Sequence, residues 1–189
     1  MNKIPTLFVR TEDRRHVTRT ITPGCEWVLA GDGVATRKYD GTCVMHDGTN
    51  WWARREVKPG KTPPTGYVAL STDDVTGRTV GWEPIGQSGF SAFHARAVIV
   101  RDTWPAGTYE LCGPRINGNP EGVTRDVLYR HATAEQLGET ELRDARTLER
   151  DVDLIESAVR QLGWEGLVFH HPDGRMAKIK ARDFPQVGA

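Results

Sequence analysis

The segment "EGLVFHHPDGRMAKIK", residues Glu165 to Lys180, holds two alternating apolar runs on either side of a Pro-Asp-Gly turn. Alternation with period two is typical of strands and Pro-Asp-Gly of turns, so the segment predicts an antiparallel hairpin. If His171 pairs with Gly174, Glu165 faces Lys180 and shares a sheet face with Lys178. One carboxylate and two ammonium groups then lie together, either as an ordinary ion pair on a solvated face or as part of a site.

The rest of the chain is divided by turns into short apolar runs. Glycine and proline account for 20 and 11 of the 189 residues, which favours a sheet-rich fold. Leu148, Val152, Ile155, Val159 and Leu162 recur at helical spacing and predict a helix over residues 148–162. These patterns indicate an α+β fold, mainly antiparallel sheets with flanking helices, in one domain. We expect strands at residues 27–30, 35–45, 50–55, 95–100, 108–112, 166–170 and 176–180.

Composition excludes several classes of protein. Basic and acidic residues balance at 25 each, so no net charge draws in a polyanion, and any phosphate binding needs local clusters. No apolar run approaches the roughly 18 residues that span a bilayer, and no signal-peptide pattern begins the chain, so we expect a soluble, cytoplasmic protein without a membrane partner. Cys25, Cys43 and Cys112 have neither zinc-ligand nor disulfide-framework spacing.

Short motifs that could carry chemistry occur in a fixed order along the chain. Each is weak alone, because strands carry exposed lysines and Asp-Gly forms turns. Their order is more specific than any one of them. The motifs are Lys38-Tyr39-Asp40-Gly41-Thr42, Arg54, Glu110 with Gly113, Glu165-Gly166, and Lys178-Ile179-Lys180.

This ordered set resembles that of the covalent nucleotidyltransferases, which include nucleic-acid ligases and mRNA capping enzymes. The segments "YELCGPRINGNPEG" and "EGLVFHHPDGRMAKIK" are further similar to a compact family of ATP-dependent RNA ligases. The resemblance covers roughly residues 34–182. It implies a single nucleotidyltransferase domain over residues 1–189, of the ATP-grasp-like ligase adenylylation type. Since nine residues follow Lys180, we expect no C-terminal oligonucleotide-binding (OB) domain.

The resemblance implies an ATP-dependent 5′-to-3′ RNA ligase of RNA repair, which joins a 5′-phosphate to a 3′-hydroxyl. Lys38 would attack ATP and carry AMP, which then passes to the RNA end. Asp40 would orient Lys38 or a metal-bound water, while Lys178 and Lys180 would hold the α-phosphate. An ordinary lysine has a pKa of about 10.4, so a neutral nucleophile at pH 7 costs about 4 to 5 kcal/mol. Neighbouring cations, desolvation and a divalent metal would lower that cost.

Further roles follow from the same resemblance. Glu110 and Glu165 would bind Mg²⁺ or Mn²⁺, or the ribose hydroxyls, and Gly41 would let the backbone approach the nucleotide. Arg54 would bind the ribose or an RNA phosphate. Tyr129 is the candidate for stacking on the base, with His131 as the alternative. The residues expected to contact RNA are Arg10, Arg14, Arg15 and Arg55.

Arg37 departs from the pattern of the family. Many ligases have a carboxylate at this position, just before the lysine, so the choice between ATP and GTP stays open. Two other enzymes remain as alternatives, a GTP-using capping-type nucleotidyltransferase and a DNA ligase-like enzyme. A catalytically silent module that binds RNA ends is the alternative from another class. No protein partner is evident from the sequence.

Overall fold

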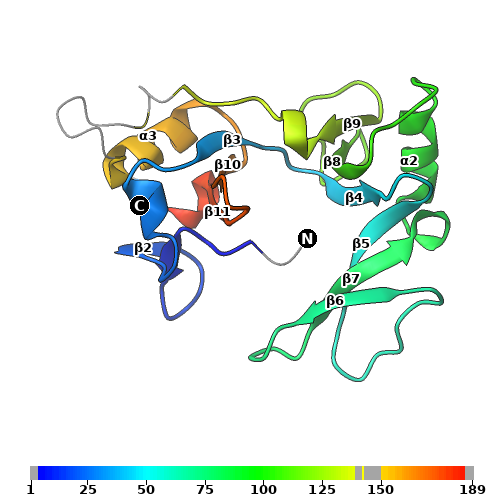
Figure 1. The fold of residues 1–189 in the computed structure, drawn as a ribbon, viewed down its shortest axis with the longest axis horizontal. Helices are drawn as coiled ribbons and strands as arrows, with labels where there is room; N and C mark the ends of the chain where they lie inside the picture. The colour runs from blue at the N-terminus through cyan, green and yellow to red at the C-terminus, as the bar shows by residue number, and fades with distance from the viewer. Residues whose placement is uncertain (1–3, 139–141, 143–149, 186–189) are drawn as a thin grey trace. The chain divides into compact units, whose positions relative to one another are not determined.

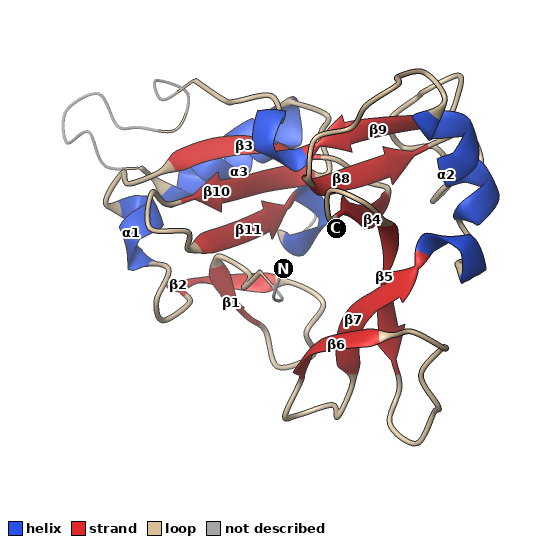
Figure 2. Ribbon diagram, turned by 45° about the vertical axis from the view of Figure 1, so that its right-hand side comes forward, coloured by secondary structure: helices blue, strands red, loops and turns tan. Residues whose placement is uncertain are grey.

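The computed structural model describes residues 4–138, 142 and 150–185, and its fold is mixed α+β (Figure 1). Strands predominate, their pairs are antiparallel, and the helices are few and short (Figure 2). The chain divides into two compact units. The central unit comprises Tyr39–Thr133, and the terminal unit comprises Ile4–Lys38 with the described residues from Ala134 onward. Each unit has its own buried core.

The terminal unit is built on a three-stranded sheet in the order β11-β10-β3. Leu167 and Phe169 of β10 and Ile179 of β11 are fully buried and share a core with Ile155 and Val159 of helix α3. Alternation along both strands therefore directs one sheet face toward the core. The elements of this unit are β1 (Phe8–Arg10), β2 (Val17–Ile21), α1 (Glu26–Leu29), β3 (Val34–Lys38), α3 (Val152–Gln161), β10 (Gly166–His170), β11 (Met176–Lys180) and the 3₁₀ turn η4 (Ala181–Asp183).

The central unit is built on a six-stranded sheet in the order β6-β7-β5-β4-β8-β9. Val44, Tyr109 and Leu111 on its inner face are almost fully buried and pack with Ala97 of helix α2. The elements are β4 (Thr42–His46), β5 (Trp51–Val57), β6 (Val68–Thr72), β7 (Thr79–Pro84), η1 (Ile85–Gln87), α2 (Ser91–Val98), β8 (Gly107–Cys112), β9 (Val127–Arg130) and η2 (His131–Thr133).

The predicted helix is confirmed as α3, Val152–Gln161. It begins where Asp151 accepts hydrogen bonds from the backbone of Asp153 (2.7 Å) and Leu154 (3.2 Å), which is a standard N-cap. Leu148, the first residue of the apolar stripe, lies outside the described residues. The strands expected at 50–55, 108–112, 166–170 and 176–180 are confirmed as β5, β8, β10 and β11.

Three strand predictions are wrong. Residues 27–29 belong to helix α1 and residues 95–98 to helix α2, because apolar runs this short do not distinguish a buried helix from a strand. The strand expected over residues 35–45 is two strands in different sheets, β3 and β4. The break falls at Tyr39–Gly41. A Cβ atom at Gly41 would lie 2.3 Å from the Leu111 carbonyl oxygen, so only glycine allows this approach to β8.

The hairpin of β10 and β11 forms, but its register differs by one residue from the prediction. The His171 amide donates to the carbonyl of Arg175 (2.9 Å) rather than pairing with Gly174, which lies inside the loop at φ +92°. Gly166 therefore pairs with Lys180, Leu167 with Ile179 and Val168 with Lys178. The extra loop residue in the left-handed conformation accounts for the shift.

Within the described part of the chain, no helix is both long enough and apolar enough to cross a membrane.

Helix α2 contributes His94 to the interior of the central unit. This side chain is 4% exposed and contacts the edge of Trp51, with 4.6 Å between the ring centroids. Burial, aided by the nearby charge of His46, lowers the pKa of His94 to about 4.

His94 is therefore neutral in the folded protein, whereas an unfolded histidine titrates near 6.5. Since the unfolded state binds a proton first, His94 destabilises the fold as the pH falls from about 6.5 toward 4. Between pH 7.5 and 4.5 this contributes a loss of about 2 to 3 kcal/mol. His94→Phe should reduce the pH dependence of the free energy of unfolding by that amount, measured by urea denaturation at both pH values. Equal pH dependence in both proteins would contradict the pKa assignment.

Candidate functional site

The carboxylate of Glu165 joins the termini of three strands in the terminal unit. Gly166 is the cross-strand partner of both Lys38 at the end of β3 and Lys180 at the end of β11. The residue before it, Glu165, is thus placed between the two lysines. Lys38 Nζ donates a hydrogen bond to Oε2 of Glu165, and Lys180 Nζ donates to Oε1. These three predicted site residues therefore meet.

Glu165 is well shielded from water, and its side chain is only 7% exposed. Burial by itself would raise its pKa, but the charge of Lys38, the hydrogen bonds from both lysines and the charge of Lys180 outweigh it. The pKa of Glu165 is held below its ordinary value. A third cation lies nearby, since Arg182 Nη2 is 3.6 Å from Oε1. The carboxylate is accordingly ionised at neutral pH and surrounded by cations.

Gly166 makes the close approach of β10 to β11 possible. A Cβ atom there would lie 2.0 Å from the Ile179 carbonyl oxygen and 2.7 Å from Lys180 Cα. Any side chain would force β10 and β11 apart, and with them Glu165 and Lys180. Lys178 lies two residues before Lys180 on the same face of β11, opposite Val168.

Glu110 organises a second group of residues, in the central unit. Its side chain extends from β8, and Oε1 accepts a hydrogen bond from the backbone amide of Gly41 (3.1 Å). Oε2 lies 3.1 Å from Nε2 of His131, whose Nδ1 is 2.9 Å from the Thr108 hydroxyl. Glu110 therefore fixes the backbone of the Lys-x-Asp-Gly motif at its glycine.

The loop between β8 and β9 holds the same motif from another side. Asn117 Nδ2 donates to Oδ1 of Asp40 (3.1 Å) and to the carbonyl of Gly41 (2.7 Å). Glu121 Oε1 accepts from the amide of Asp40 (2.8 Å). Asn117 and Glu121 are not among the residues predicted from the sequence, although they lie in the segment "YELCGPRINGNPEG". The available signal was a polar residue before a glycine in each case, Asn-Gly and Glu-Gly.

Tyr129 lies on β9 directly opposite Glu110 and therefore on the same sheet face. Its ring stacks on that of Tyr39, with 4.2 Å between centroids and 1° between planes. His131, the alternative candidate for base stacking, instead has both ring nitrogens within hydrogen-bond distance of Thr108 and Glu110. Tyr129 therefore offers a flat ring surface on which a base can stack, whereas the contacts of His131 hold the Glu110 side chain in position.

Arg37, the departure from the motif, belongs to the terminal unit. Its Nη1 lies 3.4 Å from Oε2 of Glu135, and its guanidinium lies 5.4 Å from the centre of the Trp164 ring. The side chain therefore has an acidic neighbour and an aromatic one.

The arginines predicted to contact RNA are divided between the two units. Arg10 pairs with Asp183 (3.0 Å), while Arg14 and Arg15 are exposed in the turn between β1 and β2. In the central unit, Arg55 is half-exposed and lies 3.9 Å from the buried Glu83. Arg54 precedes it on β5, opposite Trp82. The structure thus brings the predicted arginines into two separate sets.

Among the residues that the structure describes, no group of three or more histidine, cysteine or acidic side chains is arranged to hold a metal ion. The two carboxylates predicted to bind metal, Glu110 and Glu165, belong to different units. No protein-family model matches the sequence, and no curated protein is significantly similar to it.

The Glu165 cluster can bind an anion and can present a lysine nitrogen to an electrophile. Its two lysines are about four-fifths buried, with side chains 20% and 18% exposed. Charge-assisted hydrogen bonds to one carboxylate fix both nitrogens in place. An incoming phosphate would find two cations that are already positioned.

Glu165→Gln should lower the free energy of unfolding at pH 7 by about 1 to 3 kcal/mol, because two partly buried ammonium groups lose their counter-charge. The folded pKa of Glu165 is depressed, so its stabilisation is present above the ordinary value of 4.5 and is lost as the pH falls through the folded pKa. The difference in free energy of unfolding between the wild type and Glu165→Gln, measured by urea denaturation, should therefore shrink below pH 4.5.

Glu135→Gln is the matched control, because it removes one carboxylate from a pair with Arg37 in which Glu135 is 57% exposed. An exposed pair of this kind contributes about 0 to 1 kcal/mol. An effect of Glu165→Gln no larger than that of Glu135→Gln would contradict the stabilising role of the buried pair.

Proposed function

We propose that this protein is an ATP-dependent 5′-to-3′ RNA ligase in which Lys38 becomes covalently attached to AMP. The observation that carries the proposal is the binding of Lys38 and Lys180 to one buried carboxylate, Glu165. These residues come from three of the ordered motifs, and Lys38 is separated from Glu165 by 127 positions in the sequence. A mixed α+β fold with mainly antiparallel sheets is compatible with a nucleotidyltransferase domain.

In the first step, Lys38 Nζ attacks the α-phosphorus of ATP. The new N–P bond forms as the bond from the α-phosphorus to the bridging oxygen breaks, and pyrophosphate leaves. Lys38 must lose its proton to water before it attacks, and the hydrogen bond to Glu165 fixes the position of its Nζ. Lys180 and Lys178 would neutralise charge on the α-phosphate, since phosphoryl transfer depends mainly on positioning and electrostatics.

In the later steps, a 5′-phosphate oxygen of RNA attacks the phosphorus of lysyl-AMP and releases Lys38. The RNA 3′-hydroxyl then attacks the 5′-phosphate, forms the phosphodiester and releases AMP. Asp40 is held by Asn117 and Glu121, so the segment after Lys38 has a defined conformation. Fixed geometry of this kind supports in-line displacement.

A divalent cation would neutralise charge on the transferring phosphate. Mg²⁺ is commonly held by one or two carboxylates together with phosphate oxygens and water, so a cluster of three protein ligands is not required. Glu165 of the terminal unit and Glu110 of the central unit are each a candidate for that role, because each carboxylate oxygen has lone pairs beyond the hydrogen bond that it accepts in this structure.

The nucleobase would stack on Tyr129. Tyr39 covers one face of that ring at a centroid separation of 4.2 Å, which leaves no space for a base between them. The base would therefore use the other face of Tyr129. Stacking of a base on an aromatic side chain contributes about 1 to 3 kcal/mol.

Incubation with Mg²⁺ and ATP labelled at the α-phosphate should label the protein covalently, and Lys38→Ala should abolish the label. Lys61→Ala is the matched control, because Lys61 is exposed in a loop of the central unit, and it should be labelled as the wild type is. Circular dichroism checks that both variants fold. Persistent labelling of Lys38→Ala would show that Lys38 is not the nucleophile.

Parallel reactions distinguish the alternatives. Labelling by GTP and not by ATP would favour a capping-type enzyme, and absence of labelling by either would favour a silent RNA-end-binding module. Joining of a 5′-phosphate DNA in preference to RNA would favour a DNA ligase-like enzyme. Only ATP labelling followed by RNA joining supports the proposal.

Tyr129→Leu should raise the ATP concentration that gives half-maximal labelling by about tenfold, which corresponds to about 1.4 kcal/mol of lost stacking. Tyr129→Phe keeps the ring and should restore most of the affinity. If the leucine variant requires no more ATP than the wild type, Tyr129 does not bind the base.

A further inference from the structure

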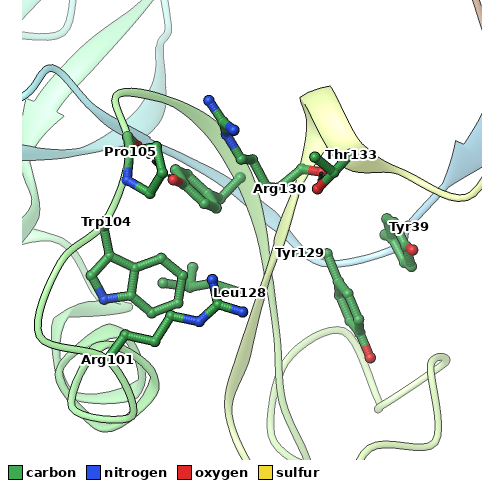
Figure 3. A pocket seen from close by; sticks show the side chains of 9 residues that line it. Tyr39, Arg101, Trp104, Pro105, Leu128, Tyr129, Arg130 and Thr133 are labelled. Carbon is green, nitrogen blue, oxygen red and sulfur yellow. Dashed lines mark hydrogen bonds between the residues drawn. The ribbon is translucent and has the colours of Figure 1, made fainter.

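A hollow of about 300 Å³ lies in the central unit at β9, the last strand of its sheet. Figure 3 shows Arg101, Trp104 and Leu128 on one side of β9 and Tyr39 and Tyr129 on the other. Arg130 also lines it. The volume is at the lower end of the range for small-ligand pockets and suits a group of the size of one nucleotide.

The charge of this hollow favours an anion. Its described lining residues include two arginines and no acidic side chain. Arg130 Nη2 donates to the carbonyl of Ala106 (3.2 Å), whereas its Nε is buried and has no hydrogen-bond partner among the described residues. The Nε atom is shielded from solvent, so a phosphate would bind the outer nitrogens of this guanidinium group, which is always charged and is a strong donor to phosphate oxygens.

The hollow also offers aromatic surface. The indole of Trp104 is fixed by its hydrogen bond to the carbonyl of Val98 (3.0 Å), and the Arg101 guanidinium lies 5.2 Å from the centre of that ring. The rings of Tyr39 and Tyr129 line the other edge, where Tyr129 is assigned above to the base of ATP. Aromatic rings beside guanidinium groups are the combination that binds the bases and phosphates of single-stranded nucleic acid.

The arginines of the hollow are distinct from the residues assigned above to ATP. Across β8 and β9, Arg130 pairs with Tyr109 and therefore lies on the opposite sheet face from the pair of Tyr129 and Glu110. Arg101 and Trp104 belong to the segment before β8.

We propose that the hollow binds one nucleotide of the RNA strand, with its base against Trp104 and its phosphate at Arg130 and Arg101. This inference rests on the proposed function, because it takes RNA as the source of that nucleotide.

Two positions test the proposal, with a fluorescently labelled 5′-phosphate oligoribonucleotide as the probe in anisotropy titrations. Arg101→Ala should weaken binding by about five- to tenfold, within the range for a charged contact to phosphate and a stacking partner. Arg130→Ala should weaken binding at least as much, and Arg130→Lys should recover only part of the loss, because lysine lacks the planar fork. Arg125→Ala, which removes an exposed charge of the same unit outside the hollow, should change binding less than twofold.

Labelling by ATP is measured on the same variants without RNA, and it separates this inference from the proposed function. Loss of RNA binding with ATP labelling retained supports the hollow as an RNA site. Wild-type RNA affinity in a folded Arg101→Ala, or an equal loss in Arg125→Ala, would overturn it. If the same variants also need more ATP for half-maximal labelling, the hollow binds ATP instead of RNA, and the inference is overturned. If ATP labels neither the wild type nor the variants, but the variants at Arg101 and Arg130 still lose RNA binding, the proposed ligase activity is refuted and the RNA site is supported.

Discussion

The pairing of Gly166 with both Lys38 and Lys180 is the constraint on which the candidate site depends. The glycine at the start of the central strand lets β11 approach closely, and the preceding carboxylate lies between the terminal lysines of the two neighbouring strands. The same sheet directs Leu167 and Ile179 into the core, so the hydrophobic packing of one face holds the charges at its end in place. Burial of apolar side chains thus stabilises an arrangement of charges that would otherwise be costly to desolvate.

Part of this arrangement could be predicted from the sequence. Alternation and the Pro-Asp-Gly turn predicted the hairpin, and the apolar stripe predicted helix α3. The register was wrong by one residue, since turn residues indicate a hairpin without fixing how many of them remain unpaired. The predicted contact between Glu165 and Lys180 forms even though the register differs, because a glutamate side chain is long enough to reach across the end of the strand.

Other features could not be predicted, for identifiable reasons. The run Trp27–Leu29 is too short to show whether its period is that of a helix or a strand. Strand β9 has four residues, so the pairing of Tyr129 with Glu110 had no visible pattern. The contacts of Asn117 and Glu121 with Asp40 come from an irregular loop, in which Asn117 has φ 50°, and such conformations leave no periodic signal.

Asn117 also introduces a chemical weakness. It is followed by Gly118, and an asparagine before glycine is prone to deamidation because the small neighbour hinders cyclisation least. The reaction would replace Nδ2, which donates to Asp40 and Gly41, by an oxygen that cannot donate when ionised. The new carboxylate would then face that of Asp40. Stored protein would therefore accumulate deamidation at Asn117, which holds the Lys-x-Asp-Gly segment. Peptide mapping by mass spectrometry would detect the change.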